Sequence, residues 1–138
     1  MKIKNYKKYH KNNKIFKNEK ITLATLKKGF YGFKVLQSGI ITPKQIEVIR
    51  RVVARITKRI GKTFINVSCT QSLTKKPLLS RMGKGVGSID SWISYVKKGK
   101  ILLEIKGVSR KVALKAFKVA QSKICLKIDF IEREIIDA

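Results

Sequence analysis

Acidic residues and histidine are scarce in this sequence, and each scarcity excludes a class of protein. Eight Asp and Glu residues face 33 Lys and Arg, which gives a formal net charge of +25. Four of the eight acids lie within the last ten positions, and no pair of acids is arranged for general acid and base catalysis. The single histidine, His10, lies in a basic segment, which leaves no histidine-based triad or metal site. We therefore expect no catalytic residue, no metal site and no cofactor.

Cysteine and long apolar runs are also in short supply. Cys69 and Cys125 are far apart and lack the spacing of metal ligands, so we expect two reduced thiols. No apolar run approaches the ~18 residues of a membrane-spanning helix. The amino terminus lacks the apolar segment of a secretory signal. The sequence thus predicts neither a membrane span nor secretion.

What the sequence does contain is enough apolar material for a core, together with a large excess of positive charge. Hydrophobic residues make up 43% of the 138 positions, which is typical of a globular domain. A compact domain with so much like charge repels itself, so a polyanion is the expected partner. Residues 1–20 are rich in lysine, and we interpret them as a basic N-terminal arm that either stays solvated or orders on RNA. Residues 21–138 are then a single α+β domain that binds RNA.

Two amphipathic helices are predicted. Thr42 and Gln45 match a capping box with Pro43 at the first helical position, and Gly61 supplies the stop. The apolar face of this helix consists of Ile46, Ile49, Val53, Ile56 and Ile60. Its opposite face is basic. The second helix is expected over residues 109–123, with a packing stripe of Ala113, Ala116, Phe117 and Ala120.

The predicted strands cover residues 29–38, 63–68, 88–96, 101–105 and 124–132. Glycines in the first of these strands indicate a bulge or bend. The third and fourth are expected to pair as a hairpin turned at Lys98-Gly99-Lys100, and residues 69–88 are expected to be irregular. In the last strand, the inward-facing residues are Ile124, Leu126, Ile128 and Phe130. The whole pattern predicts an α+β two-layer sandwich, with two helices packed on one face of a mostly antiparallel sheet.

One glycine-rich stretch, "SRMGKGVGS" (residues 80–88), raises the question of nucleotide binding. A Walker loop needs Ser or Thr after its lysine, but Lys84 is followed by Gly85. A dinucleotide fingerprint needs a third glycine where Ser88 stands, and a helix after it. Glycines also let backbone N–H groups approach phosphates closely, and Arg81 and Lys84 add positive charge. From these residues the loop could contact RNA phosphates or could simply connect two strands, and we expect no small-molecule substrate.

Longer stretches resemble a known family. "ITPKQIEVIRRVVARITKRIGKTFINV" and "LTKKPLLSRMGKGVGSIDSWISYVKKGKILLEIKGVSRKVALKAFKVAQSKI" resemble the bacterial-type large-subunit ribosomal protein L-sixteen. The resemblance runs from about residue 6, where "YKKYHK" is similar to the basic start of that family, to about residue 130. It implies a protein that supports translation within the large ribosomal subunit, with large-subunit rRNA, tRNA and neighbouring ribosomal proteins as partners. It also implies that the glycine loop points toward the tRNA cleft beside the peptidyl transferase centre.

Site residues follow from this resemblance. The tRNA-proximal loop would consist of Arg81, Met82, Gly83, Lys84, Gly85 and Gly87. The rRNA-binding residues of the arm would be Lys7, Lys8, His10 and Lys11. Those of the first helix would be Arg50, Arg51, Arg55, Lys58 and Arg59, and Lys75 and Lys76 lie just upstream of the loop.

The sequence leaves alternatives open for the genome that encodes the protein and for the class of its function. The lean toward Lys, Ile and Asn suggests an AT-rich genome, and a resemblance that begins near residue 6 leaves no room for a cleaved transit peptide. Encoding within an organelle, as part of a mitochondrial ribosome, explains both observations; a plastid or an AT-rich bacterium would explain them too. The second class of function is a free architectural protein that binds nucleic acid, because charge alone would permit it.

Overall fold

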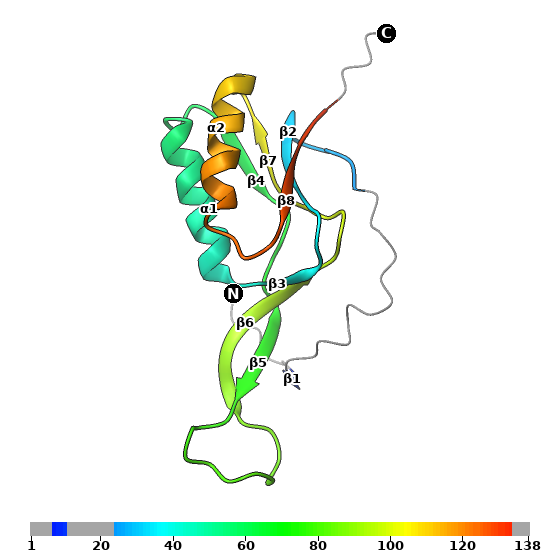
Figure 1. Cartoon of the computed structure of the whole chain (residues 1–138), viewed down its shortest axis with the longest axis vertical. Coiled ribbons are helices and arrows are strands. Elements are labelled where there is room, and N and C mark those ends of the chain that lie inside the picture. Colours follow the sequence, from blue (N-terminus) through cyan, green and yellow to red (C-terminus); the bar gives the residue numbers. More distant parts are fainter. Residues whose placement is uncertain (1–6, 11–23, 134–138) are drawn as a thin grey trace.

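The computed structural model describes residues 7–10 and 24–133, and these form two helices and two four-stranded sheets (Figure 1). One sheet has the strand order β4-β7-β2-β8 and the other has the order β1-β5-β6-β3. Every strand pair is antiparallel except β1 with β5. The elements are β1 (Lys8–Tyr9), β2 (Tyr31–Val35), β3 (Gly39–Ile41), α1 (Pro43–Ile56), β4 (Lys62–Ile65), β5 (Gln71–Lys75), β6 (Ser88–Val96), β7 (Ile101–Lys106), α2 (Arg110–Gln121) and β8 (Ile128–Glu132). The predicted α+β class is confirmed, although the strands divide between two sheets.

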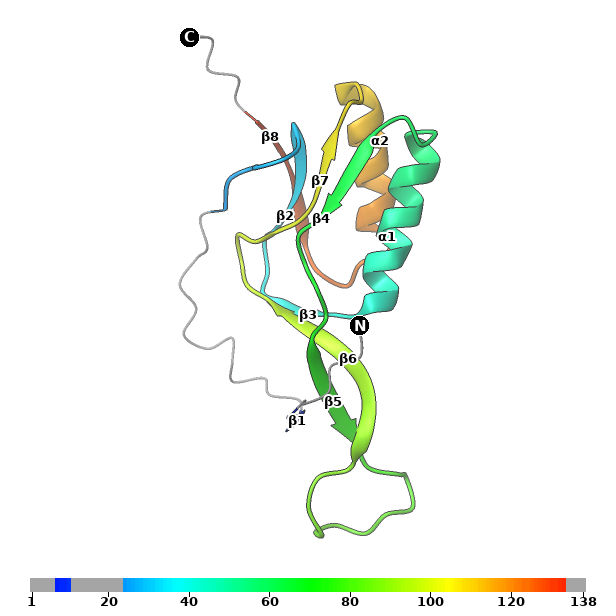
Figure 2. The ribbon, with the colours of Figure 1, turned by 180° about the vertical axis from the view of Figure 1, so that it is seen from behind.

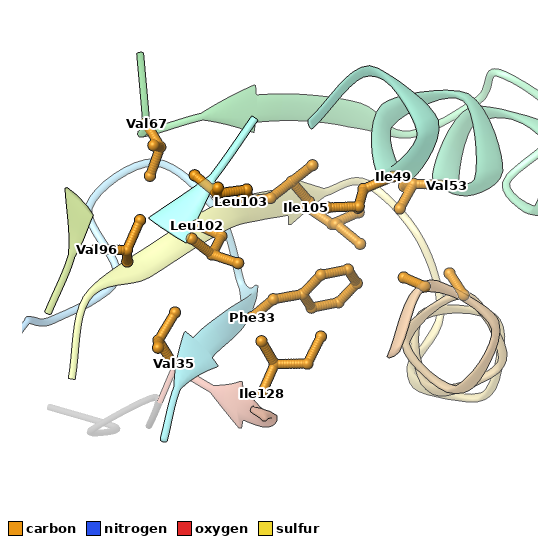
Figure 3. Close-up of a cluster of buried hydrophobic side chains, with 13 residues drawn as sticks. Phe33, Val35, Ile49, Val53, Val67, Val96, Leu102, Leu103, Ile105 and Ile128 are labelled. Carbon is orange, nitrogen blue, oxygen red and sulfur yellow. The ribbon is translucent and has the colours of Figure 1, made fainter. Parts of the chain in front are cut away.

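Both helices cover one face of the β4-β7-β2-β8 sheet, as predicted (Figures 1 and 2). Phe33 of β2 and Ile105 of β7 are fully buried and point toward the helices, where Ile49 and Val53 of α1 meet them (Figure 3). Ala116 of α2 is also fully buried and belongs to the same core cluster. The structure contains no helix, within the residues it describes, that is long and apolar enough to cross a bilayer.

Helix α1 begins as predicted but ends earlier. Thr42 Oγ1 accepts a hydrogen bond from Gln45 N, and Gln45 Oε1 accepts one from Thr42 N at 3.0 Å, which completes the capping box. The helix ends at Ile56, so the prediction that Ile60 belongs to its packing face is wrong: Ile60 is 75% exposed. After the helix Lys58 and Arg59 adopt positive φ values of 49° and 62°, and Gly61 then passes close to the end of β7, where a Cβ would lie 2.6 Å from Val108 Cγ1 and 3.3 Å from Lys106 O.

Two strand predictions are wrong. Residues 69–88 are not irregular throughout, because residues 71–75 form β5 and pair with β6. Strands β6 and β7 do not pair with each other: β6 pairs with β3 and β5, and β7 pairs with β2 and β4. The predicted turn does form, with Gly99 at a φ of 89°, but Gly99 N donates to Val35 O of β2 at 2.8 Å. This contact attaches the turn after β6 to β2 of the other sheet.

The remaining elements differ from prediction mainly at their ends. The pairing of β2 with β7 shifts register between Phe33 and Lys34, which is the predicted bulge. The last strand begins at Ile128 rather than at residue 124, yet Ile124 and Leu126 are partly buried against the core as their alternation predicted. Because burial follows side-chain direction and not strand pairing, the pattern identified the inward residues correctly and extended the strand too far.

Candidate nucleic-acid interface

The exposed face of α1 carries a shallow basic groove. It measures about 540 Å³ and is lined by Arg50, Arg51, Ala54, Arg55, Lys58 and Arg59. These positions follow from helical spacing: when Ile49 and Val53 face the core, the basic residues of the same turns face solvent. The structure thus brings together all five helix residues predicted to bind RNA. We call this surface the α1 rail.

One acidic residue, Glu47, holds part of the rail in place. Its Oε1 lies 2.7 Å from Arg50 Nη2 and 2.9 Å from Arg51 Nε, and its Oε2 accepts a further bond from Arg50 Nε at 2.9 Å. The hydrogen bonds from Arg50 and then Arg51 lower the pKa of Glu47 to about 2. Sequence reasoning noted Glu47 as the only acid of the helix but missed this role, which its i+3 and i+4 spacing to the arginines would have indicated.

The far end of the rail is free of acid partners. Among the residues that the structure describes, the ion pairs of this helix all involve Glu47, and none includes Arg55, Lys58 or Arg59. Lys58 and Arg59 have φ values of 49° and 62°, a left-handed conformation that side chains other than glycine adopt rarely. Their backbone N–H groups bond to Arg55 O and Ala54 O, so an anionic ligand would be bound by their side chains and not by these N–H groups.

The predicted glycine loop lies at the tip of the β5–β6 hairpin, which projects away from the helices (Figures 1 and 2). Gly83, Lys84 and Gly85 have consecutive positive φ values of 92°, 56° and 83°. Gly87 is needed for another reason, since a Cβ there would lie 2.4 Å from Lys75 O. Lys76 Nζ donates to Gly83 O across the loop.

The side chains of this tip are fully accessible. Arg81 and Lys84 are exposed, and so are the apolar side chains of Leu79 and Met82, each 99% accessible. The sequence has no acidic residue anywhere between 48 and 89. The tip therefore offers cations, apolar groups and glycine backbone to a partner without a competing carboxylate.

Part of the predicted arm lies beside the stem of this hairpin. Residues Lys8 and Tyr9 form β1 and pair in parallel with β5. Ser72 Oγ donates to Lys7 O at 2.6 Å, and Thr74 Oγ1 donates to Tyr9 O at 3.2 Å. Lys7, Lys8 and His10 are exposed, while Lys11 lies outside the described residues. A two-residue strand has no periodicity of its own, so no sequence pattern could have indicated this contact.

The predicted site residues thus fall on two surfaces. Arm and loop lie along the β5–β6 hairpin, with Lys75 and Lys76 at the end of β5 leading into the tip. The α1 rail lies on the body of the protein, on the helical layer (Figure 2). Both surfaces are rich in uncompensated cations, which suits a large polyanion and not a small substrate.

Comparison with known proteins provides independent information. The family model described as "Ribosomal protein L16p/L10e" matches residues 1–131. A curated protein named "Large ribosomal subunit protein uL16", from Buchnera aphidicola subsp. Cinara cedri (strain Cc), is 42% identical over 108 residues. That alignment covers 78% of this chain and 79% of the Buchnera protein.

Proposed function

Because this chain belongs to the ribosomal protein L16p/L10e family, we propose that it binds large-subunit rRNA through the α1 rail and directs its glycine loop toward tRNA. Family membership makes it a non-enzymatic protein of the large ribosomal subunit with a structural role in translation. The observation that carries the rRNA-binding role is the α1 rail, where five cations share a single acid that is already engaged by two of them. RNA phosphates would supply the missing negative charge.

The rail suits phosphate recognition in its chemistry. Arginine presents a planar fork that matches two phosphate oxygens, and the ion pairs with Glu47 favour particular directions of the exposed Arg50 and Arg51 side chains before RNA arrives. Less side-chain entropy is then lost on binding. Arg55, Lys58 and Arg59 would make the unshared contacts.

The β5–β6 hairpin would contact tRNA. Its resemblance to the family loop and its projection from the body support a reach toward tRNA beside the peptidyl transferase centre (Figure 1). Arg81 and Lys84 would contact phosphate there, and Gly83 and Gly85 would let the backbone approach it. The arm would bind rRNA through Lys7, Lys8, His10 and Lys11, and its pairing with β5 would place those contacts near the base of the loop.

We also propose residues 1–20 as the arm and residues 21–138 as a single rRNA-binding domain, with neighbouring ribosomal proteins as further partners. We propose that the protein belongs to a mitochondrial ribosome. The abundance of Lys, Ile and Asn, whose codons are AT-rich, supports this compartment. The Buchnera relative supports the bacterial alternative.

The test of rRNA binding compares two variants of equal charge change. Replacing Arg50, Arg51, Arg55 and Arg59 by Gln should weaken binding to large-subunit rRNA and reduce the slope of log affinity against log salt by about 0.9 per lost duplex phosphate contact. The control variant replaces Lys111, Lys115, Lys118 and Lys123, on and just after α2, by Gln and should change the slope far less. Equal effects would reject the rail as the binding surface.

Cosedimentation with large subunits in high salt separates this function from that of a free architectural protein that binds nucleic acid.

A further inference from the structure

A second basic groove lies on the side of the β4-β7-β2-β8 sheet that faces away from the helices. It measures about 610 Å³, and most of its lining comes from the segment that leads into β2 and from the β6–β7 connection. Figures 1 and 2 show both segments on the side of this sheet away from the helices. Four lysines line it: Lys27, Lys28, Lys97 and Lys100. Neither the family resemblance nor the helix periodicity pointed to these positions. We call this surface the lysine groove.

The wall that holds Lys97 and Lys100 is fixed by its backbone. Lys100 O accepts a hydrogen bond from Val35 N at 2.9 Å, and Gly99 N donates to Val35 O at 2.8 Å. Lys98 N donates to Ser38 Oγ at 2.8 Å. This turn is therefore attached to β2 and to the residues just after it, so the two lysines extend from a rigid base.

The opposite wall is fixed by a buried carboxylate. Glu104 Oε2 accepts bonds from the backbone N–H groups of Lys27, Lys28 and Gly29 at 3.1, 2.7 and 2.7 Å. Its Oε1 accepts a bond from Asn66 Nδ2 at 2.7 Å. The backbone of Lys27 and Lys28 is thus held in place while their side chains stay exposed.

The charge balance of the groove is strongly positive. Among the residues that the structure describes, Glu104 is the only acid in the lining; it is 1% exposed, and both of its carboxylate oxygens are already engaged. Within the described part of the chain, none of the four lysines takes part in an ion pair. Lys28 Nζ lies 5.8 Å from the centre of the Phe64 ring, a cation–π contact that leaves its charge uncompensated. Four like charges on two fixed walls repel one another, and an anion between the walls would relieve that repulsion.

We propose that the lysine groove binds the phosphate backbone of a second RNA segment, so that the protein bridges two segments of rRNA from opposite sides of its main sheet. This inference rests on the proposed rRNA-binding function. Lysine is a point charge without the planar fork of arginine, which favours contact with backbone phosphates over the reading of base edges. Four lysines on the two walls of an open groove fit a polymer of phosphates better than a single phosphate ion.

Lysine acetylation followed by mass spectrometry tests this inference on the unmodified full-length protein. The acetylation rate of each lysine is measured for the free protein, with deproteinised large-subunit rRNA, and with inorganic phosphate at matched ionic strength. We expect rRNA to slow acetylation of Lys27, Lys28, Lys97 and Lys100 severalfold. Inorganic phosphate should leave these four lysines reactive. In the presence of rRNA, the control lysines of α2 should stay reactive: Lys111, Lys115 and Lys118.

Each result decides between the two proposals. If rRNA protects Lys58 of the α1 rail but leaves the four groove lysines reactive, the groove is not an RNA site and the proposed function stands. If rRNA protects no lysine, the proposed function itself fails. Equal protection of groove and α2 lysines would mean unspecific coating and would also overturn the inference.

Variants supply a second measurement. Replacing the four groove lysines by Gln should lower the salt slope of rRNA binding by about 2 to 3, if three or so duplex phosphates are contacted. The α2 control variant, with Lys111, Lys115, Lys118 and Lys123 changed to Gln, removes the same charge and should lower it by less than about 1. Thermal unfolding of both variants should match the unmodified protein, because the groove is held together by backbone bonds and Glu104. Equal slopes for both variants would contradict the inference.

Discussion

The side-chain carboxylate of Glu104 accepts a hydrogen bond of 2.7 Å from the backbone N–H of Gly29, 75 residues earlier in the chain. Gly29 fits there because it has no side chain: a Cβ would lie 2.8 Å from Ile105 O. Burial raises the pKa of Glu104, but the hydrogen bonds from Gly29, Lys28, Asn66 and Lys27 outweigh it and hold the pKa below the ordinary 4.5. The central strand β7 and the segment before β2 are thereby joined by one charged group.

We predict that replacing Glu104 by Ala destabilises the protein by about 3 kcal/mol or more, since it leaves buried N–H donors unsatisfied. Replacement by Gln should cost less, because the amide oxygen still accepts from the backbone and a rotated Asn66 amide accepts from its NH2 group. Chemical denaturation of both variants measures these differences.

The same carboxylate predicts an acid-sensitive component of stability. Its pKa is lower in the folded protein than the ordinary 4.5, so its contribution is present above about pH 4.5 and is lost as pH falls through the folded value. The free energy of unfolding of the unmodified protein should therefore fall more steeply with acid, in this range, than that of Glu104→Gln. Parallel pH profiles for the two proteins would contradict this assignment.

The left-handed turn at Lys58 and Arg59 predicts a conflict between stability and RNA binding. Changing both residues to Gly removes about 1–2 kcal/mol of backbone strain per residue. Greater freedom of the unfolded chain offsets about 0.4–1 kcal/mol of that gain per residue. The double glycine variant should thus be at least as stable as the unmodified protein, yet bind rRNA more weakly.

The matched control for this turn is Lys58→Ala with Arg59→Ala, which removes the same charges and keeps the strain. Both variants should lose the same rRNA affinity, and the alanine variant should be the less stable of the two in thermal unfolding. A more stable alanine variant would show that the positive φ values of 49° and 62° carry no strain.

Removal of residues 1–20 tests the arm. The deletion removes β1, whose residues are exposed, together with the bonds from Ser72 and Thr74. We expect the free energy of unfolding to fall by no more than about 1–2 kcal/mol, and incorporation into large subunits to weaken. A full-length variant in which four arm residues are changed to Gln should unfold with an unchanged free energy but be incorporated less into large subunits; the four are Lys7, Lys8, His10 and Lys11. Unfolding of the deleted protein would place the arm in the core instead.

Substitution of Arg81 and Lys84 by Ala tests the loop. Both side chains are exposed, so folding and most rRNA affinity should be unchanged. We expect large subunits that contain the variant at normal occupancy to bind tRNA more weakly and to form peptide bonds more slowly. Normal values for both would reduce the loop to a connector, and failed incorporation would make it an assembly contact.

Local patterns in the sequence were sufficient for the helices and for much of the core. The capping box at Thr42, the stripe of Ile49 and Val53, and the inward alternation that ends at Phe130 all depend on neighbours within a few residues. Periodicity and capping chemistry record such short-range relations directly. The same holds for the basic face of α1, which is the complement of its apolar face, and for the exposed glycine loop.

Tertiary structure alone decided the rest, because the deciding contacts join residues far apart in the chain. The turn at Gly99 is visible in the sequence, but β6 and β7 enter different sheets because each pairs with distant strands, β6 with β3 and β5 and β7 with β2 and β4. Ile60 belongs to the helical pattern, but α1 ends at Ile56, Lys58 and Arg59 turn left-handed, and the chain then passes close to the end of β7 at Gly61. The lysine groove depends on the same kind of contact: Glu104 is an isolated acid in the sequence, and its bonds to residues 27–29 exist only once β7 and the segment before β2 have packed together.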